Sequence, residues 1–110
     1  MEQSPKTLTF VVPAYNMETY LERCVESLLS ATDNSDIEVL IVDDGSSDST
    51  PELADMYERR WPGNVRAIHQ VNKGHGGAVN TGIANATGMY VKVVDADDWV
   101  DMPSIDTLMG

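Results

Sequence analysis

Four short apolar runs divide the chain, and each is followed at once by a cluster of polar residues. The runs show no regular alternation of apolar and polar residues, which is typical of strands buried on both faces of a sheet. Segments with helical spacing of apolar residues separate them, so strand and helix alternate along the chain. The sequence therefore predicts an α/β fold, a Rossmann-like parallel sheet of about four strands with helices on both faces and right-handed crossovers. The expected strands are residues 8–12, 37–42, 65–71 and 89–94.

The expected helices can be placed between these strands. The first covers residues 17–31, with Asn16 as its N-cap. Ser49 and Glu52 fit a capping box at the start of the second helix, which ends near residue 60. A glycine-rich loop at residues 72–77 leads into a third helix at 78–86, and a further helix is expected to begin near residue 102.

The polar clusters are predicted to converge on one edge of the sheet. In open parallel sheets, ligands bind outside the carboxyl ends of the strands. The clusters that follow the four strands are residues 14–16, 43–44, 72–77 and 95–98. A binding site at this edge is the strongest inference that the residues carry without reference to any family.

Charge restricts the partners of such a site. The 110 residues, expected to form a single domain over residues 1–110, include 18 acidic and 7 basic residues, for a net charge of -11. No basic stripe is available to neutralise nucleic acid or an anionic membrane surface. A phosphorylated ligand would need a metal ion between the two negative charges. With one cysteine, Cys24, no secretory signal and no apolar run near the roughly 20 residues of a membrane span, we expect a cytoplasmic protein.

Three carboxylates within four positions, Asp95, Asp97 and Asp98, follow the last apolar run. Unpaired carboxylates this close repel one another and are costly to hold beside an apolar core. A divalent cation with hard oxygen ligands, such as Mg²⁺ or Mn²⁺, would explain the cluster, and a solvated acidic turn is the alternative. Its position on the shared edge favours the metal.

The other clusters offer groups that can hold a ligand. Asp43 and Asp44 can accept hydrogen bonds from a base or a ribose, and turn chemistry or charge at the start of a helix is the alternative. Tyr15 can stack on a base or lie in the interior. Lys73 is one of few cations available to a phosphate. His75 is interpreted as a loop residue, with a metal ligand as the less favoured alternative.

Four motifs together resemble the family 2 glycosyltransferases, and their order and spacing match from about residue 9 to residue 99. They are Val11-Val12-Pro13-Ala14-Tyr15-Asn16, the segment 42–50 with Asp43-Asp44-Gly45-Ser46, Asn72-x-Gly74 with Ala78-x-Asn80-x-Gly82, and Asp95-Ala96-Asp97-Asp98-Trp99. Each motif alone is weak, but the combination is highly specific. The resemblance implies a GT-A fold and a nucleotide-sugar donor, such as a UDP- or GDP-sugar, bound with Mg²⁺ or Mn²⁺.

The same resemblance implies roles for individual residues. Around the base it places Pro13, Ala14, Tyr15 and Asp44, with Asp43 close by. It places Asp95 near the ribose and makes Asp97 the main metal ligand, with Asp95 as a second ligand. Lining the rest of the donor pocket would be Lys73, Gly74 and Asn80.

Family members similar to this chain invert the anomeric centre with a carboxylate base that lies well downstream of the Asp-x-Asp motif. That base is expected beyond Gly110, so the chain is interpreted as the truncated, N-terminal donor-binding segment of a longer enzyme, inactive when isolated. The acceptor is unknown and would be a cell-surface polysaccharide, a lipid or a protein. The full-length enzyme would be cytoplasmic or peripheral to the inner face of the membrane.

Two alternatives remain open at this point. One is a non-catalytic nucleotide- or partner-binding module with the same fold. The other is a phosphoacceptor receiver domain, but that would place its acidic pair after the first strand rather than the second. A truncated sheet would also expose the edge of its last strand, which predicts self-association.

Overall fold

The computed structural model describes residues 7–31 and 36–95, and its strands form one parallel sheet. The strand order is β3-β2-β1-β4, so β1 and β2 are central and β3 and β4 are edges. This confirms the predicted fold class. The helix expected near residue 102 lies outside the described residues. The elements in chain order are β1 (Leu8–Ala14), α1 (Glu18–Ala31), β2 (Ile37–Asp44), α2 (Thr50–Arg60), β3 (Val65–Gln70), α3 (Gly74–Asn85) and β4 (Tyr90–Val93).

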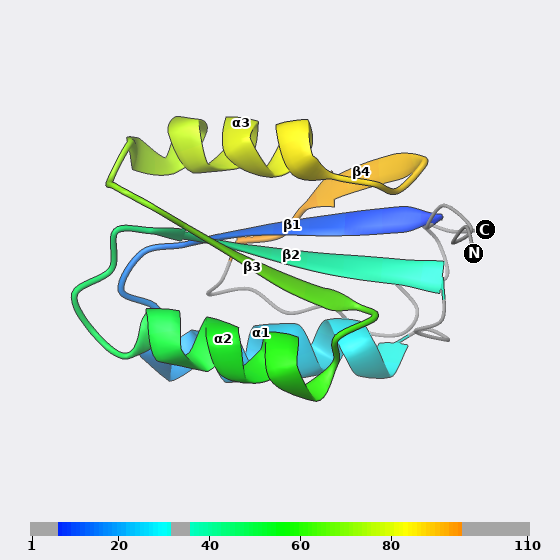
Figure 1. Ribbon diagram of the computed structural model, residues 1–110, viewed down its shortest axis with the longest axis horizontal. Helices are drawn as coiled ribbons and strands as arrows, with labels where there is room; N and C mark the ends of the chain where they lie inside the picture. Colours follow the sequence, from blue (N-terminus) through cyan, green and yellow to red (C-terminus); the bar gives the residue numbers. More distant parts are fainter. Residues whose placement is uncertain (1–6, 32–35, 96–110) are drawn as a thin grey trace.

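Helices cover both faces of the sheet. Figure 1 shows α1 and α2 together on one face and α3 alone on the other. None of these three helices combines the length and the apolar content that a membrane span requires. The arrangement confirms the predicted layers and explains why the central strands lack alternation, since every residue of β1 and β2 is buried.

The core therefore has two parts, because successive side chains of a strand point to opposite faces. Phe10 and Val12 of β1 belong to the larger cluster, on the face that α1 and α2 cover. Val11 points the other way and packs with Leu40 and with Ala78 of α3.

The edge strand β4 differs from the central strands. All of its residues are exposed or half-buried, and Lys92 is exposed on it. A charged residue on an edge strand discourages pairing with another chain, which accounts for a lysine in an otherwise apolar run. The self-association expected from this edge stays a prediction.

Pro13 extends β1 beyond its expected end at residue 12. It pairs with Val42 in the parallel register. The main-chain oxygen of Val11 accepts a hydrogen bond from Val94 N at 2.9 Å, so the main-chain N–H and C=O groups of Val11 point toward β4. The main-chain groups of Pro13, two residues later, point in the same direction, but Pro13 lies past the end of β4. Its missing N–H therefore costs the sheet no hydrogen bond.

The expected N-cap at Asn16 is wrong. Asn16 adopts a positive φ of 54° and its side chain accepts from Ser47 N at 2.8 Å. The start of α1 is capped from another segment, since Glu18 N donates to Asp48 Oδ2 at 3.2 Å and Met17 N donates to Thr50 Oγ1 at 2.9 Å. Those acceptors lie about 30 residues away, so a local capping pattern could not identify them.

The expected capping box of α2 is also wrong. Ser49 precedes the helix but makes no side-chain cap hydrogen bond. Asp48 takes that place, because its Oδ1 accepts from Thr50 N at 2.8 Å. One carboxylate thus caps both α1 and α2, which fixes the loop after β2 against the start of α1.

The glycine-rich segment is the first turn of α3 rather than a loop, because the helix begins at Gly74 and not at residue 78. Glycine also allows α3 to approach the sheet. A Cβ added to Gly82 would collide with the side chain of Val11 in β1. Close packing of α3 on β1 therefore depends on the absence of a side chain there.

We expect Gly82→Ala to lower the free energy of unfolding by about 1–3 kcal/mol, because the added methyl overpacks the contact with Val11. Gly76→Ala, in the same helix, is the matched control, since a Cβ there meets open space. It should be neutral or stabilise the helix by up to about 1 kcal/mol. Denaturant unfolding of the three proteins measures both effects, and equal stability of Gly82→Ala and the unsubstituted protein would contradict this packing.

Candidate functional site

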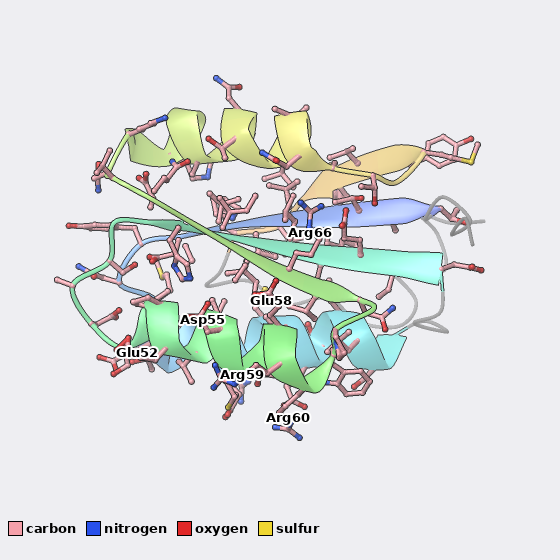
Figure 2. All side chains as sticks on the ribbon, in the orientation of Figure 1. Glu52, Asp55, Glu58, Arg59, Arg60 and Arg66 are labelled. Atoms are coloured by element: carbon pink, nitrogen blue, oxygen red, sulfur yellow. The ribbon has the colours of Figure 1, made fainter. Side chains whose placement is uncertain are left out.

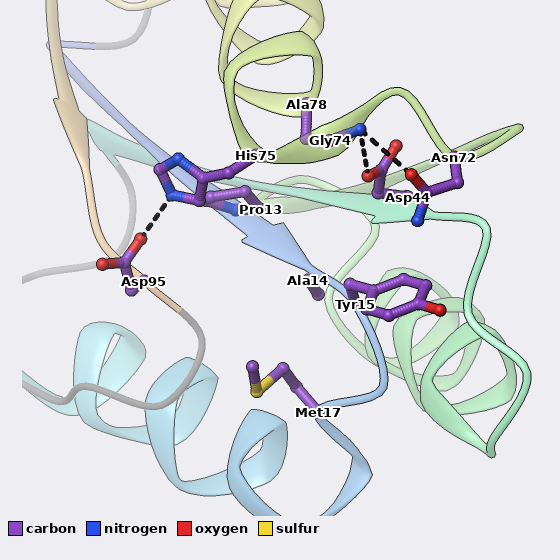
Figure 3. A pocket seen from close by; sticks show the side chains of 10 residues that line it. All are labelled: Pro13, Ala14, Tyr15, Met17, Asp44, Asn72, Gly74, His75, Ala78 and Asp95. Atoms are coloured by element: carbon purple, nitrogen blue, oxygen red, sulfur yellow. Dashed lines mark hydrogen bonds and ion pairs between the residues drawn. The ribbon is translucent and has the colours of Figure 1, made fainter.

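A pocket of about 380 Å³ lies at the carboxyl ends of the strands (Figure 3). All four of the predicted polar clusters contribute lining residues, so the predicted convergence on one edge is confirmed. The residues that line the pocket are Pro13, Ala14, Tyr15, Met17, Asp44, Asn72, Gly74, His75, Ala78 and Asp95.

Asp44 is the buried carboxylate of this pocket, and the protein holds it with three hydrogen bonds. Its Oδ1 accepts from Gln70 Nε2 at 2.9 Å and from Lys73 N at 2.7 Å. Its Oδ2 accepts from Gly74 N at 3.0 Å, the first residue of α3. The end of β2 is thereby tied to β3 and to the start of α3, where helix N–H groups favour a negative charge.

These contacts keep Asp44 ionised. Burial opposes ionisation, but the hydrogen bonds from Gln70 and from the main chain of Lys73 and Gly74 outweigh it. They hold the pKa of Asp44 below its usual value. A carboxylate offers about four acceptor positions, and the protein fills two on Oδ1 and one on Oδ2. The fourth position, on Oδ2, has no hydrogen bond among the described residues.

The end of β1 forms one wall of the pocket. Pro13 and Ala14, the last two residues of the strand, line the pocket, and Tyr15 follows them with 48% of its surface exposed. The interior alternative for Tyr15 is therefore wrong, and its ring is available to a ligand. Met17 lies at the start of α1 on the same wall (Figure 3).

His75 and Asp95 form the opposite wall. His75 belongs to the first turn of α3, and its Nε2 lies 2.8 Å from Oδ1 of Asp95, just after β4. Both side chains are largely exposed. His75 was expected in a loop of the convergent cluster 72–77, whereas the structure places it in the first turn of α3, in the pocket and paired with a carboxylate.

Asp43 lies apart from the pocket. Neighbouring strand residues point to opposite faces, so Asp43 faces α2 while Asp44 faces α3. Its Oδ1 accepts from Ser46 N at 3.0 Å and its Oδ2 lies 2.9 Å from Nδ1 of His69. Asp43 is therefore not among the lining residues, and any influence on a ligand must pass through the loop that it holds.

Two further residues assigned through the resemblance, Lys73 and Asn80, are not among the lining residues. Lys73 contributes its main-chain N–H to Asp44, while its side chain lies against Gly77. Asn80 is exposed on α3 and is not a lining residue. Asp97 lies outside the described residues, as does Asp98. Within residues 7–31 and 36–95, no three His, Cys, Asp or Glu side chains are grouped to hold a metal.

Some lining residues had no functional role in the sequence interpretation, namely Met17, Asn72, His75 and Ala78 as individual side chains. Asn72 and Ala78 stand inside a motif that carried the resemblance, so a signal existed for them. His75 stands in the predicted cluster 72–77, whereas Met17 had no signal, because it contributes only through its position after the end of β1.

Comparison with known proteins fits this geometry. The sequence profile described as Glycosyl transferase family 2 matches residues 9–109 of the chain. The chain belongs to glycosyl transferase family 2. Among relatives, the "Uncharacterized glycosyltransferase EpsJ" of Bacillus subtilis (strain 168) is 45% identical over 93 residues, which cover 84% of this chain and 26% of EpsJ.

Solved structures of similar proteins have the same fold. S. aureus TarS 1-349 in complex with UDP-GlcNAc matches with a TM-score of 0.82 and 29% identity, over 94% of this chain and 30% of that one. The mannosyltransferase PcManGT from Pyrobaculum calidifontis, in complex with GDP-Man and Mn2+, matches with a TM-score of 0.79 and 26% identity, over 93% of this chain and 32% of that one. The family 2 chain described here thus spans about a quarter to a third of the length of these proteins and has the GT-A fold.

Proposed function

We propose that the pocket binds the nucleotide of a nucleotide-diphosphate sugar, and that the chain is the donor-binding segment of an inverting glycosyltransferase. Support comes from the family, from the pocket at the carboxyl ends of the strands, and from similar proteins solved with UDP-GlcNAc and with GDP-Man. The sugar and the acceptor are not part of the proposal.

The observation that carries this proposal is the ionised carboxylate of Asp44 in the pocket lining, whose Oδ2 has only one hydrogen bond among the described residues. Uracil and guanine both present a ring N–H beside carbonyl groups, so an ionised carboxylate at the end of the pocket suits either base. The lowered pKa of Asp44 keeps that acceptor ionised at neutral pH. Tyr15, half exposed on the adjoining wall, can stack on the same base, and Pro13 and Ala14 would border it.

The diphosphate would extend toward the opposite wall. Asp95 would meet the ribose there and, together with Asp97, would hold Mg²⁺ or Mn²⁺. The hard carboxylate oxygens of Asp95 fit such an ion, and its exposure leaves room for one. A bound cation would neutralise the charge on the leaving diphosphate. Gly74, Lys73 and Asn80 would border the donor from the start of α3.

The reaction itself would be a direct displacement at the anomeric carbon. An acceptor hydroxyl forms the new bond to that carbon while the bond to the diphosphate oxygen breaks, and a carboxylate base takes the hydroxyl proton. We propose that this base lies beyond Gly110, so the 110-residue chain should bind donor without transferring sugar. The described residues would then orient the donor, and none of them would take the hydroxyl proton.

Calorimetry of the chain with UDP and with GDP, each with and without Mn²⁺, tests the proposal. We expect weak binding of at least one nucleotide that strengthens with Mn²⁺. Asp97→Ala should remove the metal dependence, whereas Glu22→Ala, which removes an exposed carboxylate from α1, should not. Failure of both nucleotides to bind under either condition would overturn the proposal. Turnover of a nucleotide sugar by the chain alone would contradict the expected inactivity.

A further inference from the structure

A second charged cluster lies on the face of the sheet that α1 and α2 cover. His69 of β3 stands between two carboxylates, with Nδ1 2.9 Å from Oδ2 of Asp43 in β2 and Nε2 2.7 Å from Oδ1 of Asp55 in α2. Both ring nitrogens thus meet acceptors, and both can donate only when the imidazole is protonated. The cluster joins β3, β2 and α2 through one imidazolium (Asp55 is labelled on α2 in Figure 2).

The surroundings of the ring favour its charge. Hydrogen bonds to Asp43 and then to Asp55 raise the pKa of His69 above its usual value, while burial opposes them less strongly. β3 is an edge strand, and among residues 7–31 and 36–95 the titratable groups that contact the ring come from β2 and α2. Those are the two aspartates, and the other charged side chains nearby on α2 are Glu52, Glu58 and Arg59.

Asp43 connects this cluster to the loop after β2. Its second oxygen accepts from Ser46 N at 3.0 Å and so fixes the turn at Gly45, whose φ is 76°. Ser46 Oγ then accepts from Asn16 N at 2.9 Å, and Ser47 N donates to the side chain of Asn16 at 2.8 Å.

Asn16 lies between two residues of the wall that the end of β1 forms. It follows Tyr15 and precedes Met17, both of which line the pocket, and it holds the unusual φ of 54°. For a residue other than glycine this conformation persists only where its surroundings impose it. The bonds from Ser46 and Ser47 impose it here, so an unbroken chain of hydrogen bonds runs from His69 to the base-binding wall.

We propose that His69 is a positioning residue for the donor pocket: its imidazolium holds Asp43, and through the loop 45–48 it holds Tyr15 and Met17 in the arrangement that binds nucleotide. This inference rests on the proposed function. It adds to that function a residue outside the pocket and a dependence on pH.

The sign of the pH effect follows from the number of donors. When His69 loses its proton, one ring nitrogen becomes an acceptor and faces a carboxylate oxygen, so one of its two contacts turns repulsive. The stabilisation is fully present below the usual pKa of 6.5 and disappears as the pH rises through the raised pKa. Nucleotide affinity should therefore fall as the pH rises through the raised pKa of His69, together with some stability.

The test is the affinity for UDP and for GDP, each with Mg²⁺, between about pH 6 and pH 9. We expect the unsubstituted chain to lose roughly fivefold or more in affinity as His69 deprotonates. His69→Gln, which is neutral, should bind weakly throughout the range. His69→Arg, which stays charged and keeps several donors, should bind well and lose most of the pH dependence. Asp55→Asn should move the fall in nucleotide affinity to lower pH, because a hydrogen bond that raises the pKa of His69 is weakened.

The matched control is Glu58→Gln, which removes one charge from α2 without contacting His69. Its affinity and pH profile should equal those of the unsubstituted chain. If His69 serves only to tie α2 to the sheet, the His69 variants will change the melting temperature but leave the pH profile of binding intact, and that result overturns the inference.

A ligand-independent readout separates this inference from the proposed function. The backbone amide resonances of Asn16, Ser46 and Ser47 should shift with the titration of His69 and should stop shifting in His69→Arg. If neither nucleotide binds but these amide resonances shift as His69 titrates, the proposed function is wrong, whereas the link between His69 and the pocket wall is supported. If the amides do not respond to His69, the inference fails whatever the nucleotide does.

Discussion

Replacing Asp44 with Asn should weaken nucleotide binding by about a hundredfold and lower the free energy of unfolding by about 1–3 kcal/mol. The amide has a single oxygen. If that oxygen meets Gln70 and Lys73 N, the amide nitrogen faces Gly74 N, and two donors confront each other. The opposite orientation leaves the other two donors without an acceptor. In neither orientation does the pocket keep a charged acceptor for a base.

Calorimetry and denaturant unfolding at neutral pH measure the two effects separately. Asp36→Asn is the matched control, because Asp36 is exposed just before β2, at the opposite end of the strand from Asp44. Because the pKa of Asp44 is lowered in the fold, its contribution to stability is present above its usual pKa of 3.8 and is lost as the pH falls through the lowered pKa. If Asp44→Asn binds nucleotide with the same affinity as the unsubstituted chain, Asp44 does not contact the nucleotide.

Gly45→Ala should lower the free energy of unfolding by about 2 kcal/mol and weaken nucleotide binding with it. Gly45 has a φ of 76°, which costs energy for any residue with a side chain. Its new Cβ would also lie 2.8 Å from Asn72 N, a main-chain atom that cannot rotate away. Asn72 lines the pocket, and Gly74 follows it, so relief of this contact displaces the wall that holds Asp44.

Gly63→Ala is the control for this substitution, since a Cβ there meets no atom within 4 Å. Unfolding and calorimetry on both variants separate a local effect from the general effect of replacing a glycine. If Gly45→Ala is as stable as the unsubstituted chain and binds equally well, the contact between the loop after β2 and the segment after β3 does not hold the pocket together.

The layered fold and the position of the site could be predicted because they depend on short-range patterns. Continuous apolar runs such as the one in β1 indicate strands buried on both faces, and the polar residues after each run must then share one edge of the sheet. Asp44 was found in this way, through its place at the end of β2. Tyr15 was found too, although only the structure excluded the interior alternative.

What the sequence could not indicate depends on partners far away in the chain. Asp48 caps two helices, so Asn16 and Ser49, the residues that fit local capping rules, do not serve as caps. His69 lies in a weak strand, and its charge depends on Asp43 and Asp55, 26 and 14 residues away. Local spacing contains no information on such contacts, which arise only when β2, β3 and α2 pack together.

The most direct test of the central claim is to map nucleotide binding on the chain by amide chemical shifts. With UDP or GDP and Mg²⁺ added, we expect the shifts to concentrate at Ala14 to Met17, at Asp44 and Gly45, and from Asn72 to Ala78. The outer surface of α1, for example at Glu22, should remain unchanged. Shifts that fall mainly on α1 or on the edge of β4, with none at Asp44 or Tyr15, would show that the pocket at the carboxyl ends of the strands is not the donor site.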